Sequence, residues 1–284
     1  MLTEDLLKPK TIMVNDQMMT YYDSEDEKGD SDHILVLIHG TTGSTASHFG
    51  FLFPILAARQ RVISIDWKEP NGVDTIELSD LSNQIADTLK ILTPNKKITL
   101  LGYSLGAVVC TQIAAQYPSL IQRLVLIAGW VRTDFQQILR NDIWKKLRLL
   151  EDDQALREYT IFCAFGGPFL ATKTYDDILP SIQAMQFNHF FDMQMDLNRR
   201  IDITTEAEAV NAPTLIIACT HDQMVPIRHQ KQLFGAIKNS RYVEIPSGHA
   251  VVFERPSEVC HHVQQFIDYP NKYAHGTVIP TPKP

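Results

Sequence analysis

Short runs of consecutive apolar residues recur along this chain, and segments with helical periodicity separate them. Each run is too short for a useful helix, and together they cover residues 33–40, 61–67, 98–101, 123–128, 212–219 and 241–245. Helical patterns lie between or after them at 51–59, 74–92, 105–117, 227–238 and 254–268. Continuous apolar strands are typical of a parallel sheet that is covered on both faces. The pattern therefore predicts an α/β fold with a mostly parallel, doubly wound sheet.

Two further segments complete the predicted domain organisation. A hairpin at 11–23 brings the number of expected strands to eight. Residues 131–205 show helical patterns and no convincing strand, which predicts a helical cap inserted over the carboxyl edge of the sheet. The core would then comprise residues 1–130 and 206–270. Residues 269–284 contain four prolines and lack periodicity, so we expect an extended tail over 271–284.

The predicted insertion is rich in large apolar side chains. Most aromatic and Met residues in such a pattern pack into a core, and here they would hold the insertion on the sheet. A few should instead face the cleft and form an apolar substrate pocket. The candidates for this lining are Trp130, Phe162, Phe165, Phe187 and Phe191.

Composition removes several classes of function. The formal net charge is -7, and no cluster of Lys and Arg is present, so we expect no nucleic-acid partner. Four cysteines without Cys-x-x-Cys spacing lie in apolar surroundings, which favours reduced, buried thiols over disulfides. The histidines show no metal-ligand spacing, so no metal or other cofactor is expected.

The chain also lacks the pattern of a secretory leader or of a membrane span. Residues 1–5 have no basic stretch followed by an apolar core, and no apolar run reaches membrane-spanning length. These observations predict a cytoplasmic protein, and the expected partner is a small-molecule substrate. They leave open whether it forms a homodimer.

One motif carries the chemistry. Residues 102–106 read Gly-Tyr-Ser-Leu-Gly between an apolar strand and a helix of small residues. A serine on such a sharp turn has a strained backbone that lifts its hydroxyl clear of the sheet, and its neighbours two positions away must lack bulk. Gly102 and Gly106 meet that need, so Ser104 is a candidate nucleophile. The motif alone also fits a glycine-rich turn with an idle serine.

A serine nucleophile needs a base within hydrogen-bond reach, a carboxylate that orients the base, and N–H donors for the oxyanion. His249 follows the last expected strand, and Asp222 follows the strand before it. Ligands bind beyond the carboxyl ends of the strands in sheets of this kind, where these side chains and Ser104 would meet. The order Ser104, Asp222, His249 is that of the α/β-hydrolase fold.

The sequence resembles cap-bearing α/β hydrolases of the serine esterase, lactonase and thioesterase type, from the hairpin to about residue 268. The resemblance rests on His39-Gly40, residues 102–106, Asp222 with Val225-Pro226, and Gly248-His249 followed by Glu254-Arg255-Pro256. It implies that Ser104 is the nucleophile, His249 the general base and acid, and Asp222 the orienting carboxylate. It further implies an oxyanion hole made by the backbone N–H groups of Thr41 and Leu105.

Other residues and chemistries stay open at this point. Asp134 could replace Asp222 as the acid. His221, beside Asp222, is a second candidate base, but adjacent residues at a strand end point in opposite directions, which favours a position at the surface or at the edge of the cleft. We expect a serine hydrolase that cleaves a carboxylic ester, lactone or thioester through an acyl-enzyme. The alternatives are a carbon–carbon bond hydrolase, an acyltransferase, a cofactor-free oxygenase or lyase, and a retired hydrolase that binds a ligand.

Overall fold

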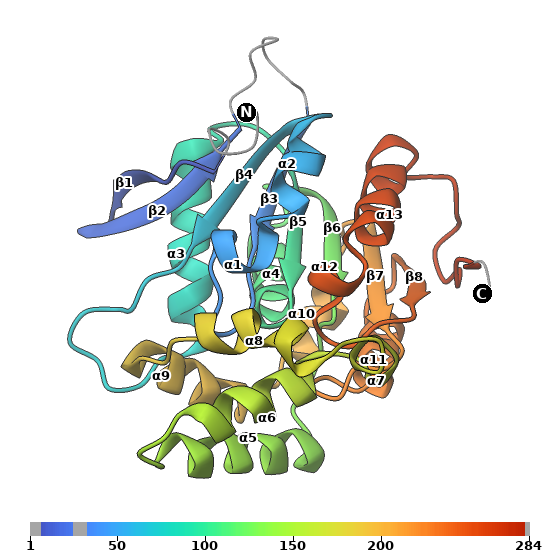
Figure 1. The fold of residues 1–284 in the computed structure, drawn as a ribbon. Coiled ribbons are helices and arrows are strands. Elements are labelled where there is room, and N and C mark those ends of the chain that lie inside the picture. The colour runs from blue at the N-terminus through green and yellow to red at the C-terminus, as the bar shows by residue number, and fades with distance from the viewer. Residues whose placement is uncertain (1–6, 25–32, 282–284) are drawn as a thin grey trace.

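The computed structural model describes residues 7–24 and 33–281. The expectation that the chain does not start with a secretory leader concerns residues 1–5, which lie outside these ranges. One eight-stranded sheet crosses the molecule in the order β1-β2-β4-β3-β5-β6-β7-β8 (Figure 1). The strands are β1 (Lys10–Val14), β2 (Gln17–Asp23), β3 (Ile34–Ile38), β4 (Arg61–Asp66), β5 (Ile98–Tyr103), β6 (Ile121–Ile127), β7 (Thr214–Cys219) and β8 (Ser240–Ile245). The hairpin β1-β2 is antiparallel, β2 pairs antiparallel with β4, and the pairings from β4 to β8 are parallel. The predicted doubly wound sheet is confirmed.

Helices cover both faces because successive strand residues point to opposite sides. In β3, Ile34, Val36 and Ile38 join one core, and Leu35 and Leu37 join the other. The first core lies under α3 (Leu78–Leu92), α4 (Leu105–Gln116), α10 (Thr204–Ala209) and α11 (Ile227–Ala236). The second lies under α1 (Thr45–Phe49), α2 (Leu52–Ala57), α12 (Val251–Glu254) and α13 (Pro256–Asp268).

Further helices lie between β6 and β7. They are α5 (Phe135–Arg148), α6 (Gln154–Ala164), α7 (Gly167–Leu170), α8 (Tyr175–Ala184) and α9 (His189–Asn198). Figure 1 shows α5, α6, α8 and α9 grouped together beyond the lower end of the sheet. An isolated bridge between Arg132 and Asp202 joins the two ends of this insertion. Its bounds at 131–205 stay a prediction.

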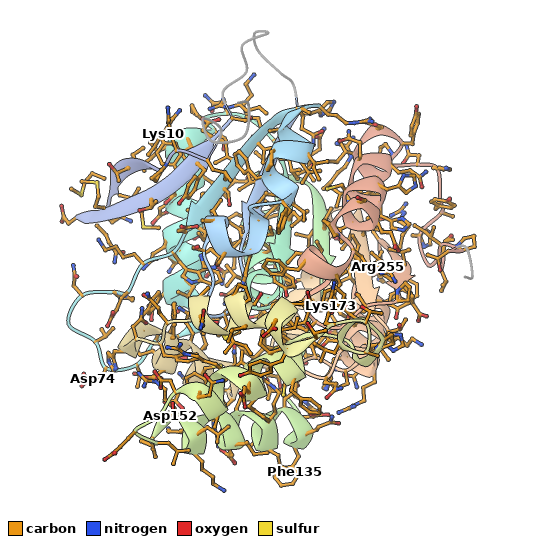
Figure 2. The ribbon with its side chains drawn as sticks, in the orientation of Figure 1. Lys10, Asp74, Phe135, Asp152, Lys173 and Arg255 are labelled. Atoms are coloured by element: carbon orange, nitrogen blue, oxygen red, sulfur yellow. The ribbon has the colours of Figure 1, made fainter. Side chains whose placement is uncertain are left out.

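Two peripheral features add to the picture. After α13 the chain returns along β8, where the N–H of Tyr242 donates to Thr277 and the N–H of Ile279 donates to Tyr242. Figure 2 shows Phe135 extending outward from the start of α5, and this residue is 71% exposed.

All four cysteines are free and buried. Within the described part of the chain, no helix has both the length and the apolar character needed to cross a membrane.

The central strand β5 generates a stability prediction. Leu100 is fully buried, so Leu100→Ala leaves a cavity and should lower the free energy of unfolding by about 2–5 kcal/mol, measured by urea denaturation. Leu139→Ala on α5 is the matched control, because Leu139 is 47% exposed and its loss should change stability by less than about 1 kcal/mol. Equal effects of the two substitutions would contradict this assignment of the core.

Candidate active site

Ser104 occupies the sharp turn between β5 and α4. Its backbone has φ 57° and ψ -122°, a conformation that L residues rarely adopt. A Cβ on Gly102 would lie 2.2 Å from the carbonyl oxygen of Gly106, and one on Gly106 would lie 2.2 Å from that of Ile38. Both glycines are therefore required by close backbone approach, as the motif predicts.

Ser104, His249 and Asp222 form a continuous chain of hydrogen bonds. The Nε2 atom of His249 lies 2.8 Å from Oγ of Ser104, and its Nδ1 lies 2.7 Å from Oδ2 of Asp222. A carboxylate accepts only, so Nδ1 carries the proton and Nε2 is left to accept from the serine hydroxyl. The three residues are almost wholly buried: Ser104 is 7% exposed, and Asp222 and His249 are each 6% exposed.

The carboxylate of Asp222 is held by the loop that follows β7. The backbone N–H groups of Met224 and Val225 donate to Oδ1 over 2.8 and 2.7 Å. The amide of Gln230 donates to Oδ2 over 3.3 Å and to the carbonyl of Val225 over 2.7 Å. These donors stabilise the ionised carboxylate and fix its direction. Sequence reasoning missed Gln230, which no motif marks.

Contacts on both sides fix the loop that carries His249. The hydroxyl of Tyr103 donates to the carbonyl of His249 over 2.8 Å. The carboxylate of Glu254 accepts from the N–H of Gly248 at 3.1 Å and from that of Gly166 at 2.9 Å. Gly166 begins the turn into α7, so this one side chain joins the histidine loop to the helical insertion.

The loop after β3 approaches the serine from the other side. A Cβ on Gly40 would lie 2.8 Å from Cβ of Ser104, so the glycine permits this approach. Asn198 of α9 donates through Nδ2 to Oγ1 of Thr41 over 2.9 Å. Within residues 7–24 and 33–281, the N–H groups of Thr41 and Leu105 have no acceptor, which suits the predicted oxyanion hole.

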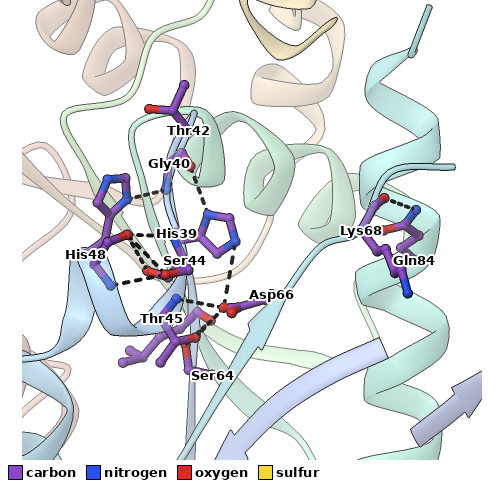
Figure 3. A network of polar contacts seen from close by, with 12 residues as sticks. His39, Gly40, Thr42, Ser44, Thr45, His48, Ser64, Asp66, Lys68 and Gln84 are labelled. Atoms are coloured by element: carbon purple, nitrogen blue, oxygen red, sulfur yellow. Dashed lines mark hydrogen bonds and ion pairs between the residues drawn. The ribbon is translucent and has the colours of Figure 1, made fainter. Parts of the chain in front are cut away.

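Two histidines support the same loop, His39 fully buried and His48 partly buried (Figure 3). Nδ1 of His48 accepts from the N–H of Gly40 at 3.1 Å, so this ring is neutral. Nδ1 of His39 donates to the carbonyl of Gly40 at 2.8 Å, and its Nε2 faces Asp66 at 3.8 Å. Burial lowers the pKa of both rings, and that of His48 falls to about 3. These contacts brace the backbone behind the serine.

A cavity of about 530 Å³ opens beside the serine, beneath the helical insertion. Of the predicted lining residues, Trp130, Phe165, Phe187 and Phe191 border it. The structure does not place Phe162 there: its side chain is 58% exposed, because it lies on the outward face of α6. Sequence reasoning also missed polar members of the lining, namely Gln137, Arg140, Asn141 and Tyr159.

Neither of the competing residues reaches His249. Asp134 caps α5 and accepts hydrogen bonds from Arg228, while Nε2 of His229 lies 3.0 Å from its carboxylate. His221 is exposed, beside the buried Asp222. The described residues contain no group of three or more His, Cys, Asp or Glu that could hold a metal ion.

A mostly parallel eight-stranded sheet, with a serine on the strained turn between β5 and α4, is the architecture of an α/β hydrolase. A family model described as alpha/beta hydrolase fold matches residues 33–256. The chain belongs to this family.

Individual relatives agree with the family assignment. The chain is 28% identical over 259 residues to pyrrolizixenacetamide deacetylase of Xenorhabdus hominickii, covering 87% of this chain and 93% of the relative. The structure of MGS-M2, an enzyme from a Medee basin deep-sea metagenome library, matches with a TM-score of 0.80 at 20% identity, over 91% and 97% of the two chains. The enol-lactonase of Burkholderia xenovorans LB400 matches with a TM-score of 0.78 at 19% identity, over 91% and 100%. These two structural matches show a shared fold.

The partly buried, neutral His48 leads to a prediction about pH dependence. The unfolded chain binds a proton on His48 below about pH 6.5, whereas the folded protein does so only near pH 3. The unfolded state therefore binds more protons in this window, and the free energy of unfolding falls as the pH falls through it. We expect His48→Gln, which still offers an acceptor to Gly40, to lose less stability than the wild type between about pH 6.5 and 4 in urea titrations.

The exposed His275 provides the control for this experiment. His275→Gln should follow the wild-type pH profile of stability. A His48→Gln profile that is superimposable on that of the wild type would contradict the assignment of His48 as a neutral acceptor.

Proposed function

We propose that this protein is a serine hydrolase that cleaves a carboxylic ester, lactone or thioester of a small, largely apolar substrate through an acyl-enzyme. The observation that carries the proposal is the unbroken chain of hydrogen bonds from Ser104 through His249 to Asp222, beside a cavity large enough for a small molecule. Membership of the α/β-hydrolase family supports it.

In the proposed reaction each group of the site has one role. Nε2 of His249 takes the hydroxyl proton as Oγ of Ser104 attacks the carbonyl carbon. The oxyanion that forms accepts hydrogen bonds from the N–H groups of Thr41 and Leu105. When the intermediate collapses, the leaving alcohol or thiol takes the proton from His249. Asp222 stabilises the imidazolium throughout, because its carboxylate is hydrogen-bonded to Nδ1.

Water completes the cycle. His249 removes a proton from a water molecule, which attacks the carbonyl carbon of the acyl-enzyme, and the same proton returns to Oγ of Ser104 as the acid product leaves. This sequence consumes only substrate and water, so it requires no cofactor.

The helical insertion supports the choice of substrate class. The segment from α5 to α9 would act as a cap, because it supplies most of the apolar lining, including Trp144, Phe187 and Met195. Apolar walls favour a substrate with an apolar acyl or ring portion. Amides belong in the substrate panel too, since the relative from Xenorhabdus hominickii is named a deacetylase.

Steady-state kinetics of Ser104→Ala and Asp222→Asn on aryl esters, lactones, thioesters and amides tests the proposal. Ser104→Ala should lower kcat by more than about a thousand-fold, because it removes the nucleophile. Asp222→Asn should lower it by about a thousand- to ten-thousand-fold, because the amide favours the wrong tautomer of His249. A Ser104→Ala variant that keeps more than about a hundredth of wild-type activity would exclude the covalent mechanism.

Asp134→Asn is the matched control for Asp222→Asn. Asn is as good a helix cap as Asp, so α5 should keep its start, and activity should stay within about ten-fold of wild type. A loss as large as that of Asp222→Asn would contradict the assignment of Asp222 as the orienting acid.

A further inference from the structure

One positively charged side chain lines the otherwise uncharged cavity. Gln137, Arg140 and Asn141 lie on α5 at spacings of three and four residues, so they share the face of the helix that borders the cavity. Among the described residues that line the cavity, Arg140 is the sole Lys, Arg, Asp or Glu. The guanidinium therefore introduces a single permanent charge into the substrate space.

The hydrogen bonds of this guanidinium are incomplete. One terminal nitrogen of Arg140 donates to Oδ1 of Asn141 over 2.6 Å. Its Nε is buried with no partner, and Nδ2 of Asn141 is also buried with no partner in the part of the chain that the structure describes. Buried donors without acceptors are costly, so two of them in adjacent residues that line the cavity indicate a missing acceptor.

The neighbouring arginines behave differently. Every arginine between residues 148 and 228 has a carboxylate within 4.0 Å, although Nε of Arg157 is also buried without a hydrogen-bond partner: Arg148, Arg157, Arg199, Arg200 and Arg228. No described Asp or Glu lies within ion-pair distance of Arg140. Burial lowers its pKa, while Cys163, Tyr159 and Asp222 oppose that change. Asp222 itself is already bonded to His249 and the loop amides.

We propose that Arg140, oriented by Asn141, binds a carboxylate group of the substrate. This inference rests on the proposed function, since it places the carboxylate in the same cavity as Ser104. A guanidinium matches a planar carboxylate with two parallel hydrogen bonds. One cation compensates one negative charge, so a monoanion fits this site better than a phosphate dianion. The substrate class is then an ester, lactone or thioester that also bears a free carboxylate.

Paired substrates test the charge requirement. The first pair is the mono-para-nitrophenyl ester of glutaric acid and its neutral isostere, in which an isopropyl group replaces the free carboxylate. The second pair places the carboxylate on the alcohol side, as para-carboxyphenyl butyrate against para-isopropylphenyl butyrate. In at least one pair the wild type should prefer the acid in kcat/KM by roughly ten-fold or more.

Substitution of Arg140 should remove that preference. In Arg140→Met the ratio of kcat/KM for acid over isostere should fall by roughly ten- to a hundred-fold, and Arg140→Lys should give an intermediate ratio. Lys146→Met is the control, because it removes a positive charge from the exposed face of the same helix and should keep the wild-type ratio. Circular dichroism and urea midpoints verify that each variant is folded.

Binding to a Ser104→Ala background separates this inference from the proposed function. Calorimetry should show that the acid esters bind more tightly than their isosteres, and that Arg140→Met removes the difference. Arg140-dependent binding without any wild-type hydrolysis would overturn the hydrolase but support the carboxylate site. Hydrolysis with no acid preference in either pair, or with a preference that Arg140→Met leaves intact, would overturn the carboxylate site alone.

Discussion

The backbone of Ser104 is the constraint on which the rest of the structure depends. A left-handed conformation at a non-glycine residue costs on the order of 1–3 kcal/mol and persists only when its surroundings enforce it. Here β5 is buried along its whole length, and α4 packs on β5 immediately after the turn. Gly102 and Gly106 allow the chain to pass where any Cβ would clash. The sheet therefore supplies the energy that holds the serine hydroxyl out toward His249.

Hydrogen bonds connect the helical insertion to the loops that carry the residues of the proposed active site. Asn198 and Gln194 of α9 bind the loop after β3, through the hydroxyl of Thr41 and the N–H of Thr42. Glu254 binds the turn before α7 and the loop of His249 together. The residues that shape the cavity are thus tied to those that would perform the chemistry. A substrate held by the residues of the insertion would therefore have a fixed position relative to the groups that would react with it.

Local signals in the sequence predict the sheet and the order of the proposed triad. They do not predict which side chains contact one another in the folded protein. Apolar runs such as 214–219 specify buried strands by themselves, and Gly-x-Ser-x-Gly specifies the turn. The face that Phe162 presents depends on how α6 packs against α5 and α8, which periodicity in an apolar helix does not determine. The same holds for Gln230, which reaches Asp222 because α11 packs against β7, and for Arg140, which borders the cavity because of where α5 lies in the folded chain.

The intact mass of the protein after incubation with a fluorophosphonate tests the central claim most directly, because only an activated serine forms the adduct. We predict a single adduct on the wild type, located on Ser104, and none on Ser104→Ala or His249→Ala. The absence of an adduct on folded wild-type protein, or an adduct that persists in Ser104→Ala, would contradict the account.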